Sequence, residues 1–413
     1  MPVNSTPAAT RLCDADEVWR LLAENVRPLD IEEVAVGEAR GRRLATDATC
    51  RFDFPPFDRA VVDGFAVRSA DFQGGAARLK AIDLVRAGGP RGAALTAGHC
   101  ARINTGAPLP DGADAVVMVE RATDPEAELV ELRDSPTFGA NIDRAGAILR
   151  HGATVVPRGA RVTNGALAAL VSAGVSRVRS HRPPRVTLLT TGDELVDAGA
   201  PLGDGQVYDS NALLLGGEIR AAGAVLLHVG RCPDDRAALE GALRDALASD
   251  VLIVVGGMSR GTHDLVPRTL SDLGVSWLVA GLQIKPGKPT RIGRSPSGGW
   301  VMGLPGNPVS AAVCFSLFGR ALMSGLAGGP CGPPPRLRAI LATPLSANGG
   351  RPMYQPARWS ADADGTLRAE PLTWRGSGDP FGLALATALI AREANAPSAV
   401  AGDAVALMPL GDL

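Results

Sequence analysis

The sequence predicts a multidomain α/β plus β protein whose central part is a doubly wound parallel sheet. A chain of 413 residues is longer than one compact core usually holds. Two proline clusters, HRPPR at 181–185 and GGPCGPPPR at 328–336, resist both helix and central strand and are typical of linkers. Between them, near-continuous apolar stretches alternate with helical patterns, which indicates parallel strands covered by helices on both faces.

The elements of this central part follow one another in a regular order. We expect buried strands at 185–191, 224–230, 250–257 and 299–306, with the stretch VSWLVA at 275–280 following a helix that contains LVPRTL. Further helices are expected at 210–223, 234–250 and 307–326. Ser210 is predicted to cap the first of these three helices, and Asn307, with Pro308 in the first turn, is predicted to begin the last.

The flanking parts are less regular. Residues 14–27 have the pattern of a surface helix, and residues 155–182 contain a helix followed by a strand-like run. Short strands with turn residues after 336 predict a small C-terminal β-barrel or sandwich. The predicted domains are an extended N-terminal linker domain made of 11–50 with 141–182, a β-rich domain at 51–140, an α/β domain at 183–328 and a C-terminal β domain at 336–413.

The composition argues against several classes of protein. A net charge of −1 and 4% aromatic residues do not suit a nucleic-acid surface. None of the six cysteines has CxxC spacing, which argues against a zinc knuckle or a redox dithiol and fits a reducing compartment. The stretch MPVNSTPAATRLC lacks the apolar core of a signal peptide, and runs such as 381–391 are too short to span a membrane. We therefore expect a cytoplasmic protein that binds neither nucleic acid nor membrane.

Three polar, glycine-bearing loops follow strands of the predicted sheet: TTGDEL at 190–195, GGMSRGTHD at 256–264 and GLPGNP at 303–308. Because ligands bind at the carboxyl ends of parallel strands, we expect these loops to gather at one edge. Glycines let backbone N–H groups approach an anion, and the helix that begins at 308 presents the positive end of its dipole. Magnesium bridged to a phosphate would use one or two nearby carboxylates, and the candidates are Asp193, Glu194, Asp209 and Asp264.

The stretch IKPGKP at 284–289 holds two of the only three lysines among 42 basic residues. Almost all the other basic residues are arginines, so lysine is expected where a compact point charge matters. Lys285 and Lys288, in a segment stiffened by Pro286 and Pro289, are therefore candidates for binding an anion. The alternative is a chance pair of surface lysines in a turn.

Longer motifs accompany these features. They are PPFDRAVVDGFAVR (55–68), INTGAPLPDGADAVVMVE (103–120), TGDEL (191–195), PLGDGQVYDSN (201–211), GGMSRGTHD (256–264), IKPGKP (284–289) and GLPGNPVSA (303–311). In these motifs and in their order along nearly the whole chain, the sequence resembles the molybdopterin molybdenumtransferases, the MoeA family that includes the corresponding domain of gephyrin. The resemblance implies an elongated homodimer of four-domain subunits, with a central domain like the molybdopterin-binding MogA fold.

The resemblance also implies a reaction, the insertion of molybdate into the dithiolene of adenylylated molybdopterin with magnesium-assisted release of AMP. The active site would lie between the central domain and the β-rich domain of the partner subunit, and a MogA-type adenylyltransferase and a recipient molybdoenzyme would be further partners. The candidate residues are Asp63, Asp264, Lys285 and Lys288 for catalysis; Thr191, Gly192, Asp193, Asp209, Ser210, Asn211, Gly256, Gly257, Ser259, Pro305, Gly306, Asn307 and Pro308 for binding the pterin nucleotide; and Glu194 and Asp264 for magnesium.

The sequence departs from the family's pattern at two places. Ala60 stands where the family usually has serine, and Ala147 with Ile148 stands where it typically has an acidic residue or pair. Asp143 lies a few residues earlier. Two hypotheses follow: a working transferase with a remodelled oxyanion pocket, which we favour, and a non-catalytic protein that binds or carries molybdopterin.

Overall fold

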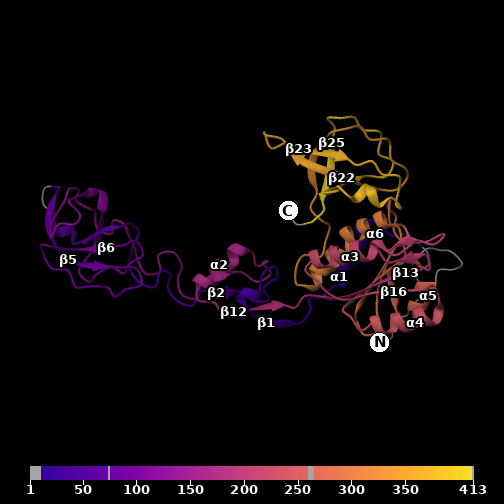
Figure 1. The fold of residues 1–413 in the computed structure, drawn as a ribbon, viewed down its shortest axis with the longest axis horizontal. Helices are drawn as coiled ribbons and strands as arrows, with labels where there is room; N and C mark the ends of the chain where they lie inside the picture. Colours follow the sequence, from indigo (N-terminus) through magenta and orange to yellow (C-terminus); the bar gives the residue numbers. More distant parts are fainter. Residues whose placement is uncertain (1–10, 73–74, 259–264, 412–413) are drawn as a thin grey trace. The chain divides into compact units, whose positions relative to one another are not determined.

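The chain folds into two compact units (Figure 1). Unit 1 comprises Met1–Glu32, Gly41–Arg43 and His181–Leu413, and unit 2 comprises Glu33–Arg40 and Leu44–Ser180. The structure is a computed structural model and describes residues 11–72, 75–258 and 265–411.

The core of unit 1 is a six-stranded sheet. Its strand order is β16 (Val225–Cys232), β13 (Arg185–Thr191), β17 (Val251–Val255), β20 (Trp300–Leu304), β19 (Arg291–Arg294) and β18 (Ser276–Val279). The first four strands are parallel, and β18 runs in the same direction, but β19 is antiparallel to both of its neighbours. The prediction of a wholly parallel sheet is therefore wrong at β19. This strand has four residues with an arginine at each end, so it lacks the apolar run that revealed the others.

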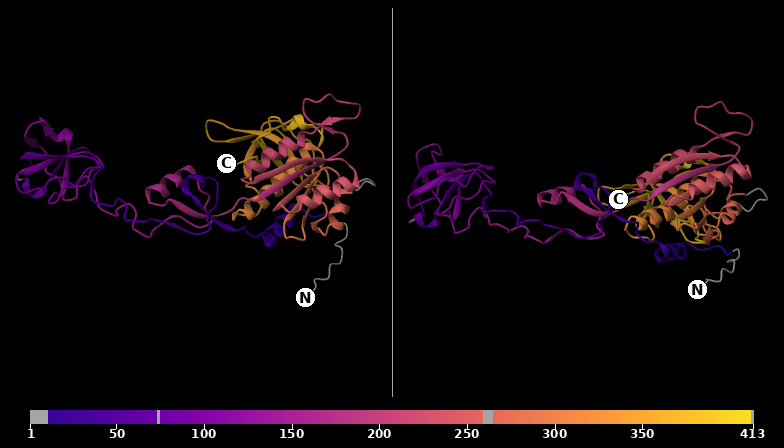
Figure 2. Two further views of the ribbon diagram at one scale, coloured as in Figure 1. Left: turned by 60° about the horizontal axis from the view of Figure 1, so that its bottom comes forward. Right: turned by 90° about the horizontal axis from the view of Figure 1, so that it is seen from below.

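Helices cover both faces of this sheet, as predicted (Figures 1 and 2). Alternate residues of one strand explain how: Val251 and Ile253 belong to one apolar core, whereas Leu252 and Val254 belong to another. Because both faces of β17 are buried, its sequence, VLIVV, is apolar without interruption. The first core is closed by α1 (Ala15–Asn25), α3 (Ser210–Ala221), α6 (Pro308–Cys314) and α7 (Arg320–Leu326), and the second by α4 (Arg236–Ala246) and α5 (Leu265–Asp272).

The ends of these helices follow ordinary capping chemistry. Asp14 accepts a hydrogen bond from the Glu17 N–H at 2.7 Å and begins α1, whose Trp19 indole N–H donates to the Leu317 carbonyl at 2.9 Å. The predicted cap of α3 is wrong, because Asp209 and not Ser210 accepts from the Ala212 N–H, at 3.0 Å. Serine and aspartate are adjacent here and both are good caps, so composition does not separate them.

The helical run Pro308–Leu326 is continuous through a π-helical segment, Phe315–Gly319, between α6 and α7. Within the described part of the chain it is the one helix long and apolar enough to cross a membrane, and 89% of its most apolar window is buried inside the protein. Such burial is typical of a core helix. All six cysteines are free thiols.

Unit 2 is rich in short strands, as predicted for residues 51–140. Its largest sheet has the order β7 (Ala115–Met118), β4 (Gly64–Val67), β6 (His99–Ile103), β5 (Ala77–Val85), β9 (Leu129–Leu132) and β8 (Ala122–Thr123). Short two-stranded ladders join β1 (Ile31–Ala35) to β12 (Arg177–His181), β2 (Ala48–Thr49) to β11 (Thr154–Val156), and β3 (Arg59–Ala60) to β10 (Ile142–Asp143), beside α2 (Asn164–Ser172). Residues before and after the large sheet therefore pair with each other.

The C-terminal residues close into a five-stranded barrel, which decides between the barrel and the sandwich left open by the sequence. The order is β21 (Leu337–Leu341), β23 (Leu367–Pro371), β22 (Met353–Ala361), β24 (Ala388–Arg392) and β25 (Ala404–Pro409). The remaining short elements are β14 (Leu195–Val196) and β15 (Val207–Tyr208), which pair with each other, and four 3-10 turns at Val36–Glu38, Ser69–Asp71, Val119–Arg121 and Pro380–Leu383.

A half-buried ion pair ties the first proline cluster to the central sheet. Arg182 donates two hydrogen bonds to Asp250, at 2.6 and 2.8 Å, and the Arg185 N–H donates a third at 2.8 Å. Burial alone would raise the pKa of Asp250, but the hydrogen bonds from Arg182 and from the Arg185 N–H lower it below its ordinary value. This carboxylate therefore fixes where β13 and β17 begin.

We expect Asp250→Ala to lower the free energy of unfolding of unit 1 by about 2 kcal/mol, because it removes both close hydrogen bonds of a half-buried guanidinium and leaves only the exposed Asp30 carboxylate near it. Urea denaturation measures the change. In the parent chain the stabilisation is complete above the ordinary aspartate pKa of about 3.9 and is lost as the pH falls through the lower folded-state value. The control is Asp30→Ala, which removes a 90% exposed carboxylate 3.6 Å from the same arginine and should cost less than about 0.5 kcal/mol. Equal urea midpoints for both variants would contradict the assignment.

Candidate functional site

The described residues that begin the three predicted loops lie at one edge of the sheet. Strands β13, β17 and β20 are adjacent and parallel, and they end at Thr191, Val255 and Leu304. The Gly256 N–H donates to the Leu304 carbonyl at 3.1 Å, which joins the second loop to the third. The predicted gathering of the loops is therefore confirmed, whereas the roles of their residues stay predictions.

The loops approach so closely that side chains do not fit between them. At Gly256, where φ is +97°, an added Cβ would overlap the carbonyl oxygen of Thr191. At Gly257, where φ is +58°, it would press on Val266. The Thr191 hydroxyl is buried beside both glycines and has no hydrogen-bond partner within the described residues. The ends of these loops thus present backbone groups and one unused hydroxyl, which suit a ligand that bonds to main-chain groups.

The start of α3 is tied into the same edge. Asp209 accepts from the Thr190 hydroxyl at 2.6 Å through the carboxylate oxygen that does not cap the helix. The Asn211 side chain donates to the Gly306 carbonyl at 2.6 Å, and its own oxygen is buried without a partner among the residues the structure describes. Ser210 is exposed in the first turn. The N-termini of α3 and of the run beginning at Pro308 therefore meet at this edge, each with the positive end of its dipole.

The GLPGNP loop differs from expectation at its asparagine. Pro305 is buried, Gly306 is exposed, and Pro308 occupies the first turn of α6 as predicted. Asn307 stands at the cap position, but its side chain makes no capping hydrogen bond and instead donates to the Ser377 hydroxyl at 2.9 Å. The competing partner comes from the C-terminal part of the chain, which local sequence does not reveal.

The acidic residues of TGDEL have different surroundings. Asp193 accepts from the Asp234 N–H at 3.0 Å, so one of its oxygens is already used. Glu194 is exposed and its carboxylate lies over Gly192, where an added Cβ would overlap it. Ser259 and Asp264, the remaining predicted residues of this edge, lie outside the described residues.

Magnesium is implied by the resemblance, and the donor set can be tested for it. In the described ranges, no three histidine, cysteine, aspartate or glutamate side chains form a metal-binding group. The exposed Glu194 carboxylate does fit the common mode in which magnesium uses one or two carboxylates together with substrate phosphates. The residues present therefore fit magnesium held jointly with a phosphate ligand.

The lysine loop leaves the sheet at the same edge. Because β18 runs parallel to β20, residues 280–290 depart from the end at which β20 also stops. The Lys285 N–H donates to the Pro352 carbonyl at 2.8 Å, and the Lys288 carbonyl accepts from the Leu282 N–H at 2.8 Å. Pro286 and Gly287 are buried, whereas both lysine side chains are exposed and neither has an ion-pair partner within the described residues. Both charges are thus free for a ligand.

Two C-terminal segments contact the GLPGNP and lysine loops, which the sequence did not predict. The Ser377 carbonyl accepts from the Val309 N–H at 3.1 Å, next to the GLPGNP loop. Arg351 donates to the Ile284 carbonyl at 2.9 Å, next to the lysine loop. The only local signal is the turn-rich stretch RGSGDP at 375–380, which is equally typical of any surface loop.

Asp63 belongs to unit 2 and is held by the INTGAP motif. It accepts from the Thr105 N–H at 2.7 Å and the Thr105 hydroxyl at 3.2 Å, and the Asn104 amide approaches to 3.5 Å. The hydrogen bond from the Thr105 backbone, followed by those of the two side chains, lowers the pKa of Asp63 below its ordinary value. The exposed carboxylate is therefore ionised at neutral pH and fixed in direction.

The departures from the family's pattern also lie in unit 2. Ala60 is buried in β3, opposite Ile142. Ile148 is 58% exposed, so no core demands an apolar residue at that position. Asp143 pairs with Arg59 across β3 and β10 at 3.0 Å. This carboxylate is already neutralised by an arginine.

Comparison with known proteins decides the family. Residues 13–174 match the model described as MoeA N-terminal region (domain I and II), and residues 187–324 match "Probable molybdopterin binding domain". Residues 338–410 match MoeA C-terminal region (domain IV). The chain belongs to the MoeA family.

Relatives and solved structures agree with this assignment along the full chain. Molybdopterin molybdenumtransferase of Haemophilus influenzae is 32% identical over 398 residues, which cover 95% of this chain and 97% of that protein. Molybdopterin molybdenumtransferase 2 of Mycobacterium tuberculosis is 33% identical, with coverages of 85% and 94%. The crystal structure of the molybdopterin biosynthesis MoeA protein of Pyrococcus horikoshii superposes with a TM-score of 0.81 at 29% identity, covering 98% of this chain and 100% of that one.

We expect the lysine loop to carry the anion affinity of this MoeA-family protein. Lys285→Ala and Lys288→Ala should each weaken AMP binding about tenfold at low salt, and the double variant should weaken it further, because each change removes a charge-assisted contact to phosphate. Isothermal titration calorimetry at two salt concentrations measures the loss. Lys80→Ala is the matched control, since the third lysine lies in unit 2 and pairs with Glu128 at 2.8 Å. Unchanged AMP affinity in the double variant would refute the anion site.

Proposed function

We propose that this transferase of molybdenum cofactor biosynthesis inserts molybdate into adenylylated molybdopterin and releases AMP, with magnesium. The observation that supports the proposal is that two lysines without an ion-pair partner in the described residues follow a strand that ends at the same sheet edge. Three glycine-bearing motifs and two helices begin at this edge. A pterin phosphate joined to AMP, together with an oxyanion, carries several negative charges. Such a substrate needs point charges and backbone donors in one place.

Binding would divide between two kinds of group. Lys285 and Lys288 would hold phosphate or molybdate oxygens as point charges, and the start of α3 and of the run from Pro308 would direct N–H groups at phosphate. The unused Thr191 hydroxyl and Asn211 carbonyl oxygen would take hydrogen bonds from the ligand, because a buried polar atom without a partner is costly.

Magnesium would be held by Glu194 and by phosphate oxygens of the substrate. When bound, it would neutralise the negative charge of the departing AMP. This chain's own part is to orient the pyrophosphate against the lysines and to hold the ends of the three glycine-bearing loops close together. In both tasks the protein contributes positioning and fixed positive charge, which are large terms in phosphoryl chemistry.

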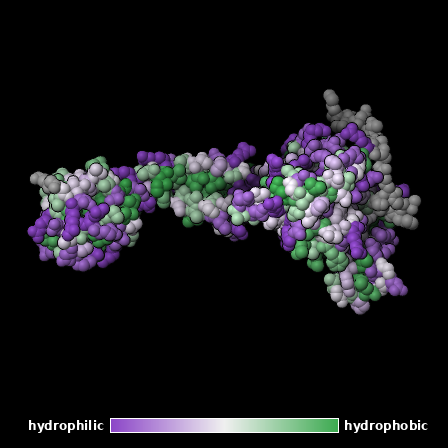
Figure 3. Space-filling view, turned by 90° about the horizontal axis from the view of Figure 1, so that it is seen from above, coloured by the Kyte–Doolittle hydropathy of each residue, from purple (hydrophilic) through white to green (hydrophobic). Residues whose placement is uncertain are grey.

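Asp63 would complete the site from a second copy of the chain. The support for a second copy is apolar surface that this chain leaves open, around α2 in unit 2 (Figure 3), where Val171 is 64% exposed. In unit 1, Val225, Leu227 and Val229 are 44%, 55% and 41% exposed on the edge strand β16. Apolar surface of this extent on an edge strand and a helix favours burial against a partner. The ionised Asp63 would then accept a hydrogen bond from a protonated oxygen of molybdate or its water.

Turnover distinguishes this proposal from the carrier hypothesis, which the exposed Ile148 and the arginine-paired Asp143 favour. Purified chain given adenylylated molybdopterin, molybdate and magnesium should release AMP and yield metallated cofactor, measured by chromatography of the nucleotide. A MogA-type adenylyltransferase would supply the substrate, and a recipient molybdoenzyme would take the product. Tight pterin binding without AMP release would identify a carrier.

Mixed copies test the placement of Asp63. Asp63→Asn and the Lys285→Ala, Lys288→Ala double variant should each lose turnover when assayed alone. If each site takes its lysines from one copy and its aspartate from the other, heterodimers of the two variants regain one intact site, so an equal mixture should recover about a quarter of the parent activity. The two variants mixed without subunit exchange provide the control. No recovery after exchange would place Asp63 in the same copy as the lysines or outside the site.

A further inference from the structure

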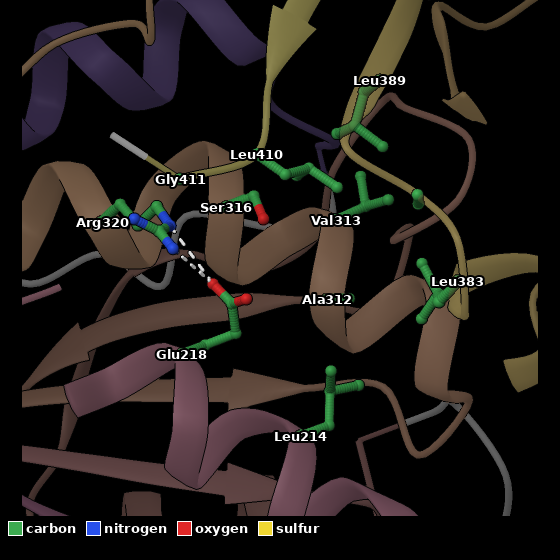
Figure 4. Close-up of a pocket in the computed structure, with 11 residues that line it drawn as sticks. Leu214, Glu218, Ala312, Val313, Ser316, Arg320, Leu383, Leu389, Leu410 and Gly411 are labelled. Atoms are coloured by element: carbon green, nitrogen blue, oxygen red, sulfur yellow. Dashed lines mark hydrogen bonds and ion pairs between the residues drawn. The ribbon is translucent and has the colours of Figure 1, made fainter. Parts of the chain in front are cut away.

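A separate cavity of about 220 Å³ lies in unit 1, away from the loops described above (Figure 4). Its walls come from α3, from the helical run Pro308–Leu326 and from the C-terminal residues. The apolar part of the lining includes Leu214, Ala312, Val313, Leu383, Leu389 and Leu410. The cavity is partly open to solvent, so a small molecule can enter it from outside.

Polar atoms on the wall are arranged for a ligand with a hydrogen-bond donor. Ser316 is 9% exposed, and its hydroxyl has no hydrogen-bond partner within the described residues although it lines the cavity. Arg320 donates to Glu218 at 2.8 and 3.2 Å, and both bonds use the same carboxylate oxygen. The other oxygen of Glu218 and the Ser316 hydroxyl therefore remain as acceptors (Figure 4).

Ser316 lies in an irregular part of the helix. It belongs to the π-helical segment Phe315–Gly319, which interrupts a run that is α-helical on both sides. Segments of this kind are rare and occur frequently at functional sites, because the extra residue per turn redirects a side chain. The irregularity is thus a second, independent sign of a binding site.

The two helices that line the cavity also begin at the sheet edge. On α3, Asn211 contacts the GLPGNP loop, while Leu214 and Glu218 follow on the same face at helical spacing and line the cavity. On the other helical run, Ala312, Ser316 and Arg320 follow Pro308 at intervals of four residues. A ligand in the cavity therefore contacts the same two helices whose N-termini lie at the proposed anion site.

We propose that this cavity binds a small aromatic or short aliphatic molecule with one N–H or O–H donor, and that its occupancy strengthens binding of the anionic substrate at the sheet edge. The second half rests on the proposed function. An apolar cavity of about 150 Å³ is known to hold benzene, so this larger one accommodates a bicyclic molecule such as indole. The indole N–H would donate to the Ser316 hydroxyl, and its rings would lie against the apolar wall.

Calorimetric titration of the full chain with indole tests the site. Indole should bind with one-to-one stoichiometry, about fivefold more weakly after Ser316→Ala, because one hydrogen bond is lost. Ala312→Phe should abolish binding by filling the space. Leu213→Phe is the matched control, since Leu213 is 73% exposed on α3 and does not line the cavity, and it should bind indole like the parent. No binding to the parent chain, or equal binding to Ser316→Ala and the parent, would overturn the site.

AMP titration with and without saturating indole tests the coupling. We expect indole to strengthen AMP binding about threefold or more in the parent and the Leu213→Phe control, and not in Ala312→Phe. Equal AMP affinities with and without indole in the parent would overturn the coupling while leaving the site. If AMP does not bind at all, the proposed function fails and so does the coupling, whereas the indole titrations still decide the cavity by themselves.

Discussion

The direction of five strands is the constraint on which the rest of the molecule depends. Strands β13, β17 and β20 are adjacent and parallel, and β18 regains their direction because β19 returns between it and β20. Four connections therefore leave the sheet on one side, although they are separated by up to about a hundred residues of sequence. Reversing any one strand would carry its polar loop to the opposite edge.

Within that edge, the backbone and the side chains have different tasks. Gly256 leaves room for one loop to touch the next, and Asp209 and Asn211 use their polar atoms to bind neighbouring loops together. What remains without a partner in the described part of the chain is the Thr191 hydroxyl, one oxygen of Asn211 and the two lysine charges. The loops thus use most of their polar atoms on one another and leave one hydroxyl, one amide oxygen and two cations. The hydroxyl and the cations suit an anionic ligand, and the amide oxygen suits a donor on the same ligand.

The sequence predicted what depends on local pattern. The strand at 185–191 is found with the predicted bounds, because a run of valine, leucine and threonine comes directly after two prolines and an arginine. The antiparallel β19 was missed because Arg291 and Arg294 flank only two central residues. The contacts of Ser377 and Arg351 could not be predicted, since each joins segments 67 to 70 residues apart and neither has a periodic pattern. Distant pairings are decided by tertiary packing, which single-sequence reasoning does not reach.

One acidic candidate, Asp63, belongs to a different unit from the two candidate lysines. A carboxylate placed among Lys285 and Lys288 would pair with them and cancel the field that attracts an oxyanion. Asp63 instead lies in unit 2, where the Thr105 backbone keeps it ionised without help from a lysine. Asp143 shows the alternative, because it pairs with Arg59 at 3.0 Å. Asp63 in unit 2 and the two lysines in unit 1 each lack an ion-pair partner within the described residues, so the charge of each is uncompensated by its own unit there.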